Sequence, residues 1–218
     1  MIEFRNVSKF YLTPTSRKVV LDRLTLTLRS GTKVGVLGRN GAGKSTLIGM
    51  IAGTTRPNSG EIRRHASISW PLGFSGGFHS DLTGAQNIRF VARIYGMDTN
   101  ALSAYVEDFA ELGDFINMPI RSYSSGMKAR LAFGMSMGIA FDWYLVDEVT
   151  AVGDTAFKKK SLAVFKHRLK DAGLLMVSHS ASTIRNYCEA GLVLENGQAR
   201  YFDDVKEALA FHDRNMSR

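Results

Sequence analysis

Residues 38–46 read Gly38-Arg39-Asn40-Gly41-Ala42-Gly43-Lys44-Ser45-Thr46, which fits the phosphate-binding pattern G-x-x-x-x-G-K-[ST]. The apolar run Lys33 to Leu37 precedes this stretch with the length of a strand, and Leu47 to Ala52 follows it as a helix that Gly53 closes. In that context the glycines let backbone N–H groups point inward around phosphates, while the helix N-terminus and Lys44 add positive charge. Ser45 is placed to hold Mg²⁺. The stretch therefore predicts a nucleotide-binding α/β fold.

Length and composition are those of a globular protein. The chain has 218 residues, of which 44% are hydrophobic, and this suffices for the core of one α/β domain. The longest uncharged apolar stretch, Leu131 to Phe141, is too short to cross a bilayer, and the N-terminus does not resemble a signal peptide. The single cysteine, Cys188, excludes an internal disulfide and is expected to be a packing residue. These features predict a protein that stays in the cytosol.

The positive charge is spread unevenly. Of the formal net charge of +8, residues 1–109 carry +7 and residues 110–218 carry +1, so the excess lies with the phosphate loop. Solubility with a polyanionic ligand, an anionic membrane surface and nucleic acid are the possible explanations. Because the sequence has no zinc-finger, RNP or basic-helix pattern, we expect no nucleic-acid partner.

The N-terminal third is predicted to be rich in strands. Ile2 to Val7 is a first strand, and Leu24 to Leu28 alternates leucine with threonine, so one of its faces is buried. A third β region covers Glu61-Ile62 and Ser67 to Trp70, after the turn at Pro57 to Gly60. We therefore expect the opening of the chain to be rich in strands, with one phosphate-loop helix.

The next segment, Pro71 to Leu82, is glycine-rich, aromatic and nearly uncharged, with Phe74 and Phe78 inside it. A loop of this kind is either buried against the chain's own core or forms a docking face for a partner. The sequence leaves both interpretations open.

From residue 83 the apolar period becomes helical. Thr83 and Gln86 form a capping-box pattern before apolar residues at helical spacing. Further helices are predicted at about residues 101–112 and within residues 121–140. The last of these begins with Tyr123-Ser124-Ser125-Gly126-Met127-Lys128, an N-terminus that can present N–H groups to an anion and can equally be an ordinary cap.

Two apolar strands end in polar side chains. Trp143 to Val146 leads into Asp147, which is expected to support Mg²⁺, and Glu148, which is expected to face the water that attacks the γ-phosphate. Leu174 to Val177 leads into Ser178-His179, and a histidine at the carboxyl end of such a strand lies where ligands bind. It can hydrogen-bond a γ-phosphate oxygen. The chain closes with a hairpin that turns at Asn196-Gly197 and a helix from about residue 205 to 212.

Taken in order along the whole chain, these motifs resemble those of an ABC-type ATPase subunit. Four stretches are similar to the ATP-binding subunits of bacterial capsular polysaccharide exporters: Gly38 to Thr46, Ile68 to Leu72, Tyr123 to Leu131, and Val146 to Asp154. The resemblance implies an α/β P-loop NTPase fold, with a core sheet, an N-terminal antiparallel β subdomain and an inserted α-helical subdomain. It implies a single ATP-binding domain, with a RecA-like core at residues 1–82 and 141–218 and the helical subdomain at about 83–140.

The resemblance also implies roles for individual residues. Tyr11 would stack on adenine, and Ser45 and Asp147 would serve Mg²⁺. Glu148 would be the general base, and His179 would contact the γ-phosphate. Phosphates of ATP would be held by Gly38, Arg39, Asn40, Gly41, Ala42, Gly43, Lys44, Ser45 and Thr46. The signature would be formed by Ser124, Ser125, Gly126 and Met127, with Asp154 as the acidic end of a segment that crosses between subunits.

The chain departs from the common pattern of the family in two places. The usual signature Leu-Ser-Gly-Gly-Gln is here Tyr123 to Met127, which keeps only Ser124 and Gly126. Most relatives carry a glutamine before the helical insert, where this chain has about Phe74. The polysaccharide exporters depart in the same way.

One phosphate loop and one signature in a chain imply a head-to-tail homodimer with two ATP molecules at its interface. The absence of a predicted span implies an integral membrane permease subunit as partner, at the cytoplasmic face of the bacterial inner membrane. The loop Pro71 to Leu82 and the helix that starts at Thr83 are candidates for the groove that receives the permease. No direct contact with polysaccharide is expected.

The function expected from the resemblance is transport of lipid-linked capsular polysaccharide, driven by closing of the dimer on ATP and reopening on hydrolysis. An O-antigen or teichoic-acid exporter is the alternative within transport. A soluble ABC protein acting on ribosomes or DNA is the alternative from another class, and such proteins usually have two fused cassettes or a coiled-coil insert, which this sequence lacks. A GTPase would need an Asn-Lys-x-Asp motif, and a P-loop kinase would not need the signature helix.

Overall fold

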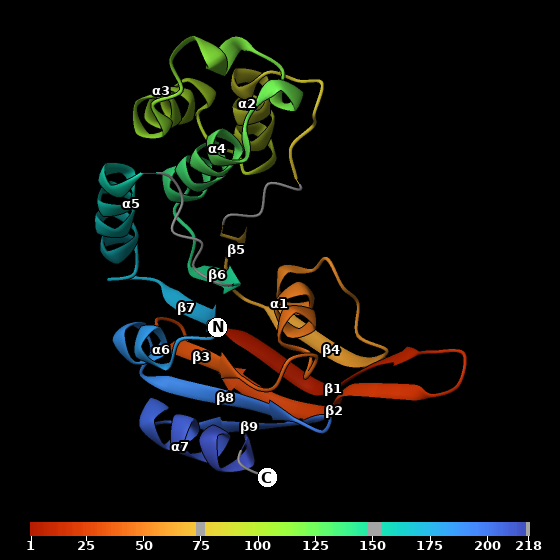
Figure 1. Ribbon diagram of the computed structural model, residues 1–218. Coiled ribbons are helices and arrows are strands. Elements are labelled where there is room, and N and C mark those ends of the chain that lie inside the picture. The colour runs from red at the N-terminus through yellow and green to blue at the C-terminus, as the bar shows by residue number, and fades with distance from the viewer. Residues whose placement is uncertain (73–76, 148–153, 217–218) are drawn as a thin grey trace. The chain divides into compact units, whose positions relative to one another are not determined.

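The computed structural model describes residues 1–72, 77–147 and 154–216. The chain forms two compact units (Figure 1). The first comprises Met1–Pro71, Phe141–Glu148 and Asp171–Arg218, and the second comprises Leu72–Ala140 and Val149–Lys170.

The first unit is built on a six-stranded sheet in the order β5-β6-β7-β3-β8-β9. Its strands are β3 (Lys33–Leu37), β5 (Ile68–Pro71), β6 (Trp143–Asp147), β7 (Gly173–Val177), β8 (Ala190–Glu195) and β9 (Gln198–Phe202). Neighbours from β5 to β8 are parallel, and only β9 runs antiparallel to its neighbour. The central strands are nearly continuous apolar runs because helices cover both of their faces. The predicted hairpin turn at Asn196-Gly197 is confirmed, with φ of 48° and 79° as a two-residue turn with both φ positive requires.

A second sheet in this unit, ordered β2-β1-β4, confirms the predicted antiparallel β region at the N-terminus. It consists of β1 (Ile2–Leu12), β2 (Arg17–Leu28) and β4 (Ser59–Arg64). β1 and β2 are longer than the alternating pattern predicted, since their pairing continues to Leu12 and Arg17. Asn6 and Arg23 have φ of 49° and 48°, and the register shifts between Phe4 and Val7. These irregularities break the alternation of apolar and polar side chains, so the sequence pattern ends before the strands do.

Helices cover both faces of the six-stranded sheet in the first unit (Figure 1). α1 (Lys44–Ala52) packs on one face, and α6 (Ala181–Tyr187) and α7 (Val205–Met216) pack on the other. α1 buries Leu47, Ile48, Met50 and Ile51 in the core. Cys188, directly after α6, is buried as predicted for a packing residue, and burial raises the pKa of its thiol to about 12.

A carboxylate ties the beginnings of β5 and β6 together. Asp142 Oδ2 accepts hydrogen bonds from the Ser67 backbone N–H at 2.7 Å and from Ser67 Oγ at 2.8 Å. These hydrogen bonds, the backbone one first, hold the pKa of Asp142 below its ordinary value. Because the pKa of Asp142 is lower in the folded state, the stabilisation that these hydrogen bonds give the folded protein is present above the unfolded pKa of about 4. It is lost as the pH falls through the folded pKa.

We therefore expect Asp142→Ala to destabilise the protein by about 1 kcal/mol at pH 7, the usual net contribution of such hydrogen bonds. Thermal unfolding followed by circular dichroism at pH 7 and at lower pH measures this. The difference from wild type should shrink as the pH falls below about 4. Asp171→Ala, at an exposed carboxylate, is the matched control. A difference that does not depend on pH would contradict the assignment.

The second unit is helical. It contains α2 (Gly84–Ile94), α3 (Thr99–Ala110), α4 (Ser125–Gly138) and α5 (Thr155–Arg168), with short 3₁₀ helices η1 (Gly113–Asn117) and η2 (Ile120–Ser122). The capping box at α2 is confirmed: Gln86 N–H donates to Thr83 Oγ1 at 3.1 Å, and Thr83 N–H donates to Gln86 Oε1 at 2.9 Å. Within residues 1–72, 77–147 and 154–216, no helix combines the length and the apolar character needed to span a bilayer.

Helix α5 was not predicted from the sequence. Its buried side chains are only Phe157, Ser161 and Phe165, so its apolar stripe is too narrow to stand out. Tertiary contacts supply what the pattern lacks, because Phe109 of α3 lies 5.4 Å from Phe157 and 5.9 Å from Phe133 of α4, between ring centroids. This aromatic cluster joins three helices of the second unit.

Candidate functional site

The carboxyl ends of three neighbouring strands meet at one edge of the six-stranded sheet. The register pairs Asp147 of β6 with Val177 of β7, and Val177 with Val36 of β3. The segments that follow these strands therefore begin side by side. Ligands bind at this edge in open α/β sheets.

A cavity of about 590 Å³ lies at this edge, within the first unit. It is lined by residues from five segments of the chain: Tyr11, Lys18, Val20, Asn40, Gly41, Gly43, Lys44, Ser45, Thr46, Asp147, Val177 and His179. The remaining predicted loop residues lie around it, because Gly38 and Arg39 line an adjoining cavity with His179, and Ala42 lines a third. The fold thus brings together, at one cavity, the residues of this unit that are predicted to bind phosphate, adenine and Mg²⁺.

The loop before α1 is shaped to hold an anion. Gly43 is the N-cap of α1, with φ of 107°, and a Cβ at this position would collide with the Val20 side chain. A glycine is needed for both reasons. Because a glycine N-cap offers no side chain, the N–H groups in the first turn of α1 stay open to a ligand.

Lys44 is partly buried and bends back over the loop. Its Nζ donates to the carbonyl oxygen of Gly38 at 2.7 Å and to that of Arg39 at 3.1 Å. The ammonium group is therefore held at the mouth of the loop, where it adds a full positive charge to that of the N–H groups.

Tyr11 lies at the end of β1 and is 44% exposed. Its hydroxyl is 3.4 Å from Thr46 Oγ1, and the Nζ of Lys9 lies 4.8 Å from the centroid of its ring. An exposed aromatic ring beside an anion-binding loop offers a flat face on which a purine can stack.

The residues of the cavity fit a nucleoside triphosphate with Mg²⁺. Ser45 provides a hydroxyl oxygen and Asp147 a carboxylate, which are ligand types that Mg²⁺ takes from proteins beside phosphate oxygens. Asp147 is half-buried at the end of β6. Glu148, the predicted general base, lies outside the described residues, as does Phe74.

The predicted signature lies in the second unit. Ser124 is the N-cap of α4, and its Oγ accepts a hydrogen bond from the Met127 N–H at 3.2 Å. Tyr123 before it is buried and donates from its hydroxyl to the Phe115 carbonyl oxygen at 2.6 Å. A Cβ at Gly126 would meet only Ser124 Oγ, at 3.9 Å. The helix start is thus anchored from behind, and its first turn, with Ser125 and Gly126, has open space beside it.

Asp154 is the N-cap of α5 and accepts a hydrogen bond from the Phe157 N–H at 2.9 Å. It also pairs with Arg130 of α4 at 2.7 Å, and the guanidinium of Arg130 lies 4.4 Å from the Phe157 ring centroid. The Phe157 hydrogen bond, helped by the charge of Arg130, holds the pKa of Asp154 below its ordinary value. The end of the predicted crossing segment is thereby tied to the signature helix within one unit.

Two cavity residues were missed from the sequence. Lys18 and Val20 lie on β2, far along the chain from the loop that they reach. They belong to no motif, and only the pairing of β1 with β2 brings them to the site. His212 on α7 was also missed; it lines the adjoining cavity, and burial lowers the pKa of its imidazole.

Comparisons with known proteins agree on one family. The model of a family described as ABC transporter matches residues 21–151. The chain is 46% identical to the ATP-binding protein BexA of Haemophilus influenzae, over 99% of this chain and 100% of that protein. It is 47% identical to the capsule polysaccharide export ATP-binding protein CtrD of Neisseria meningitidis serogroup B, over 98% and 99%.

Solved structures of ATP-binding cassettes share the fold, and one of them illustrates the likeness. It is a dimeric post-hydrolysis state of the ATP-binding cassette MJ0796 bound to ADP and Pi, with a TM-score of 0.76 at 20% identity, covering 92% of this chain and 97% of that one. The predicted fold class is thereby confirmed.

Proposed function

Because this chain belongs to the ABC transporter family, we propose that it is the ATP-hydrolysing subunit of an exporter that moves lipid-linked capsular polysaccharide across the bacterial inner membrane. One observation carries the choice of substrate. The chain is 47% identical, over 99% of that protein's length, to a protein named for capsule polysaccharide export. The cavity at the phosphate loop supports the ATPase part of the proposal.

In this proposal the cavity residues bind and orient ATP. The N–H groups of the loop and the Lys44 ammonium hold the phosphates, and Tyr11 stacks on the adenine. Ser45 and Asp147 would hold Mg²⁺, which would supply positive charge to offset the charge that develops on the phosphate oxygens. His179 donates a hydrogen bond to the γ-phosphate. Glu148 accepts the proton of the attacking water.

The proposal includes two partners. A second copy of the chain would complete each site head to tail, with Ser124, Ser125, Gly126 and Met127 of one copy against the ATP held by the other. An integral membrane permease would hold the pair at the cytoplasmic face of the membrane. Both units of the chain would act as a single ATP-binding domain.

The permease would dock beside the loop before α2 and on α2 itself. Phe78 in this loop is half-buried, and along α2 Phe90 and Ile94 are 55% and 62% exposed. Large apolar side chains left exposed on one helix are typical of an interaction surface.

The function is tested in cells that lack their own capsule export ATPase. The wild-type gene, expressed with its permease, should restore polysaccharide on the cell surface, and a Lys44→Ala variant should leave the polymer inside. Surface O-antigen or teichoic acid that depends on the chain while capsule does not would favour the alternative exporter. Copurification with ribosomes instead of a membrane protein would contradict transport.

The docking surface has its own prediction. A Phe90→Ser, Ile94→Ser double variant should keep ATP binding, because both side chains are exposed, but should lose copurification with the permease and surface polymer. Leu162→Ser on α5, another exposed apolar residue of the same unit, is the matched control. Normal export by the double variant would place the permease elsewhere.

A further inference from the structure

Lys18 lies where no motif predicts a functional residue. On the paired strands β1 and β2 it stands directly opposite Tyr11. Side chains of directly opposed residues in an antiparallel pair lie on the same face. Both line the cavity of about 590 Å³ at the phosphate loop.

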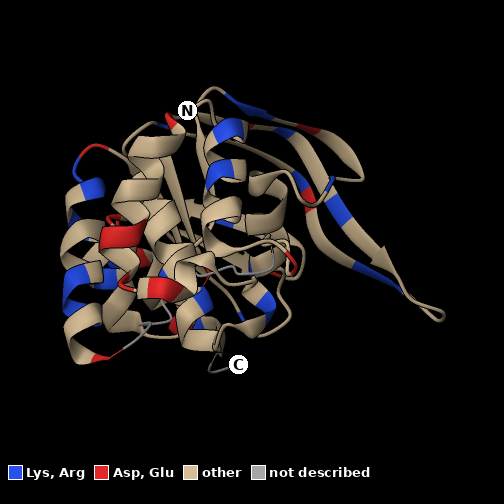
Figure 2. Cartoon of the chain, turned by 90° about the horizontal axis from the view of Figure 1, so that it is seen from above, with Lys and Arg blue, Asp and Glu red and all other residues tan. Residues whose placement is uncertain are grey.

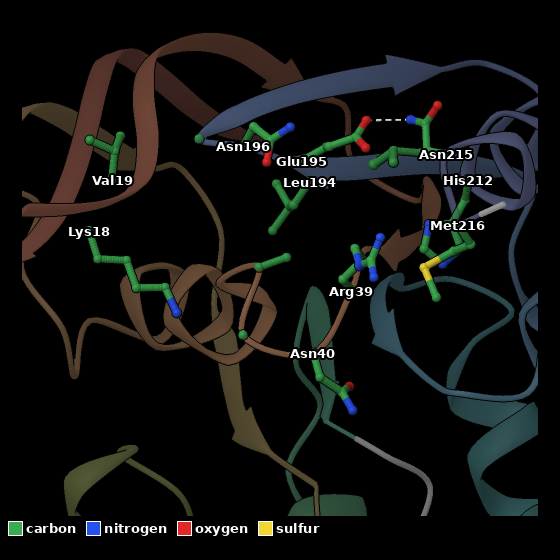
Figure 3. A pocket seen from close by; sticks show the side chains of 14 residues that line it. Lys18, Val19, Arg39, Asn40, Leu194, Glu195, Asn196, His212, Asn215 and Met216 are labelled. Carbon is green, nitrogen blue, oxygen red and sulfur yellow. Dashed lines mark hydrogen bonds between the residues drawn. The ribbon is translucent and has the colours of Figure 1, made fainter. Parts of the chain in front are cut away.

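Strand β2 lies along the phosphate loop, and alternate residues of the strand meet alternate residues of the loop. Val20 packs against Gly43, and two residues earlier the Lys18 Nζ lies 3.2 Å from the position that a Cβ on Gly41 would occupy. Since alternate residues of a strand share one face, the loop positions 41 and 43 are met by positions 18 and 20. Figure 3 shows Lys18 pointing from its strand toward this loop.

The strand is anchored from its other side. Val19 lies 2.9 Å from the position of a Cβ on Gly197, and the Asp22 N–H donates to the Gly197 carbonyl oxygen at 2.7 Å. These contacts fix the backbone of β2 against the β8–β9 hairpin. The strand that carries Lys18 is therefore held in place beside the phosphate loop.

The other lysine and arginine side chains near Lys18 on the β1–β2 hairpin have different partners. Figure 2 shows Lys and Arg recurring along β1 and β2. Arg17 stacks on the Phe10 ring at 3.6 Å, and Lys9 lies over Tyr11 and donates to the Arg56 carbonyl oxygen at 2.9 Å. Within the part of the chain that the structure describes, Lys18 forms no ion pair. Its charge faces a cavity that already holds the ammonium of Lys44.

We propose that Lys18 is a nucleotide-binding residue that contacts the polyphosphate of ATP beside Gly41. Two ammonium groups at one cavity repel each other, and a polyanion between them turns that repulsion into two attractions. Tyr11 and Lys18 then bind the base and the phosphates from opposed positions of one hairpin. The proposal rests on the ATPase function proposed above.

The test is a fluorescence titration of the full chain with MgATP, MgADP and adenosine. Lys18→Met should weaken binding of MgATP and MgADP by about tenfold, the scale of one hydrogen bond to a charged group. Adenosine should bind as it does to wild type. Lys18→Arg should keep most of the affinity. Arg17→Met, which removes the neighbouring charge on the opposite face, should bind all three ligands as wild type does.

Equal MgATP affinity of wild type and Lys18→Met would overturn the proposal. An equal loss in Arg17→Met would mean that only net charge matters, and an equal loss for adenosine would mean that Lys18 acts on the base; either result also overturns it. Because the Lys18 side chain is exposed, its variants should melt at the wild-type temperature, and this measurement checks that they are folded. If wild type binds no MgATP, the ATPase proposal itself fails, which is a different result.

Discussion

Glu148→Gln is expected to lower the rate of ATP turnover by about 10²- to 10⁴-fold, the usual contribution of a general base. The residue follows Asp147, which ends β6 at the edge of the cavity. A glutamine has nearly the same shape but cannot take up the proton of the attacking water. Binding of MgATP should therefore be unchanged, and the signal to measure is phosphate release at saturating MgATP.

The matched control for this variant is Glu207→Gln, the same chemical change on the exposed side of α7. It should hydrolyse ATP at the wild-type rate. Turnover near wild type in Glu148→Gln would place the base at another residue. Because a variant that binds but does not hydrolyse ATP should accumulate the closed state, its ATP-dependent dimerisation, measured by light scattering, also tests the proposed head-to-tail pair.

Lys44→Ala is expected to lower the affinity for MgATP by at least about 100-fold, because it would remove the partly buried ammonium group that is proposed to make a charge-assisted contact to the phosphates. The ammonium lies at the mouth of the loop, held by the carbonyl oxygens of Gly38 and Arg39. Loss of these two hydrogen bonds also leaves the carbonyl groups without that donor. Thermal unfolding of the variant must therefore be measured beside its affinity.

The control for Lys44 lies on the same strand-loop-helix segment. Lys33→Ala removes a lysine at the opposite end of β3, so affinity for MgATP should not change. Lys44→Arg keeps the positive charge but places it on a side-chain group of a different shape. Comparing this variant with Lys44→Ala separates the effect of losing the charge from the effect of misfolding. Wild-type affinity in Lys44→Ala would refute the role assigned to this residue.

Features of the fold that depend on neighbouring residues could be predicted from the sequence, whereas the aromatic cluster of the second unit could not. The capping box at Thr83 and the Asn196-Gly197 turn were predictable, because a hydrogen bond three residues away or a required positive φ is written in neighbouring residues. Helix α5 was not, since its few buried side chains become an apolar face only against Phe109 of α3. The link between Asp154 and Arg130 likewise joins residues that no local pattern connects.

The candidate site divides in the same way. The sequence alone determined the phosphate loop, because the glycines, Lys44 and the flanking strand and helix are consecutive and their backbone preferences act locally. It also marked Asp147 and His179 as polar ends of apolar strands. Only the tertiary structure decided that these ends meet, through the register of β6, β7 and β3, and that Lys18 reaches the loop from β2. Which distant residues touch depends on strand pairing and packing across the whole unit, and that information is not carried by any short stretch of chain.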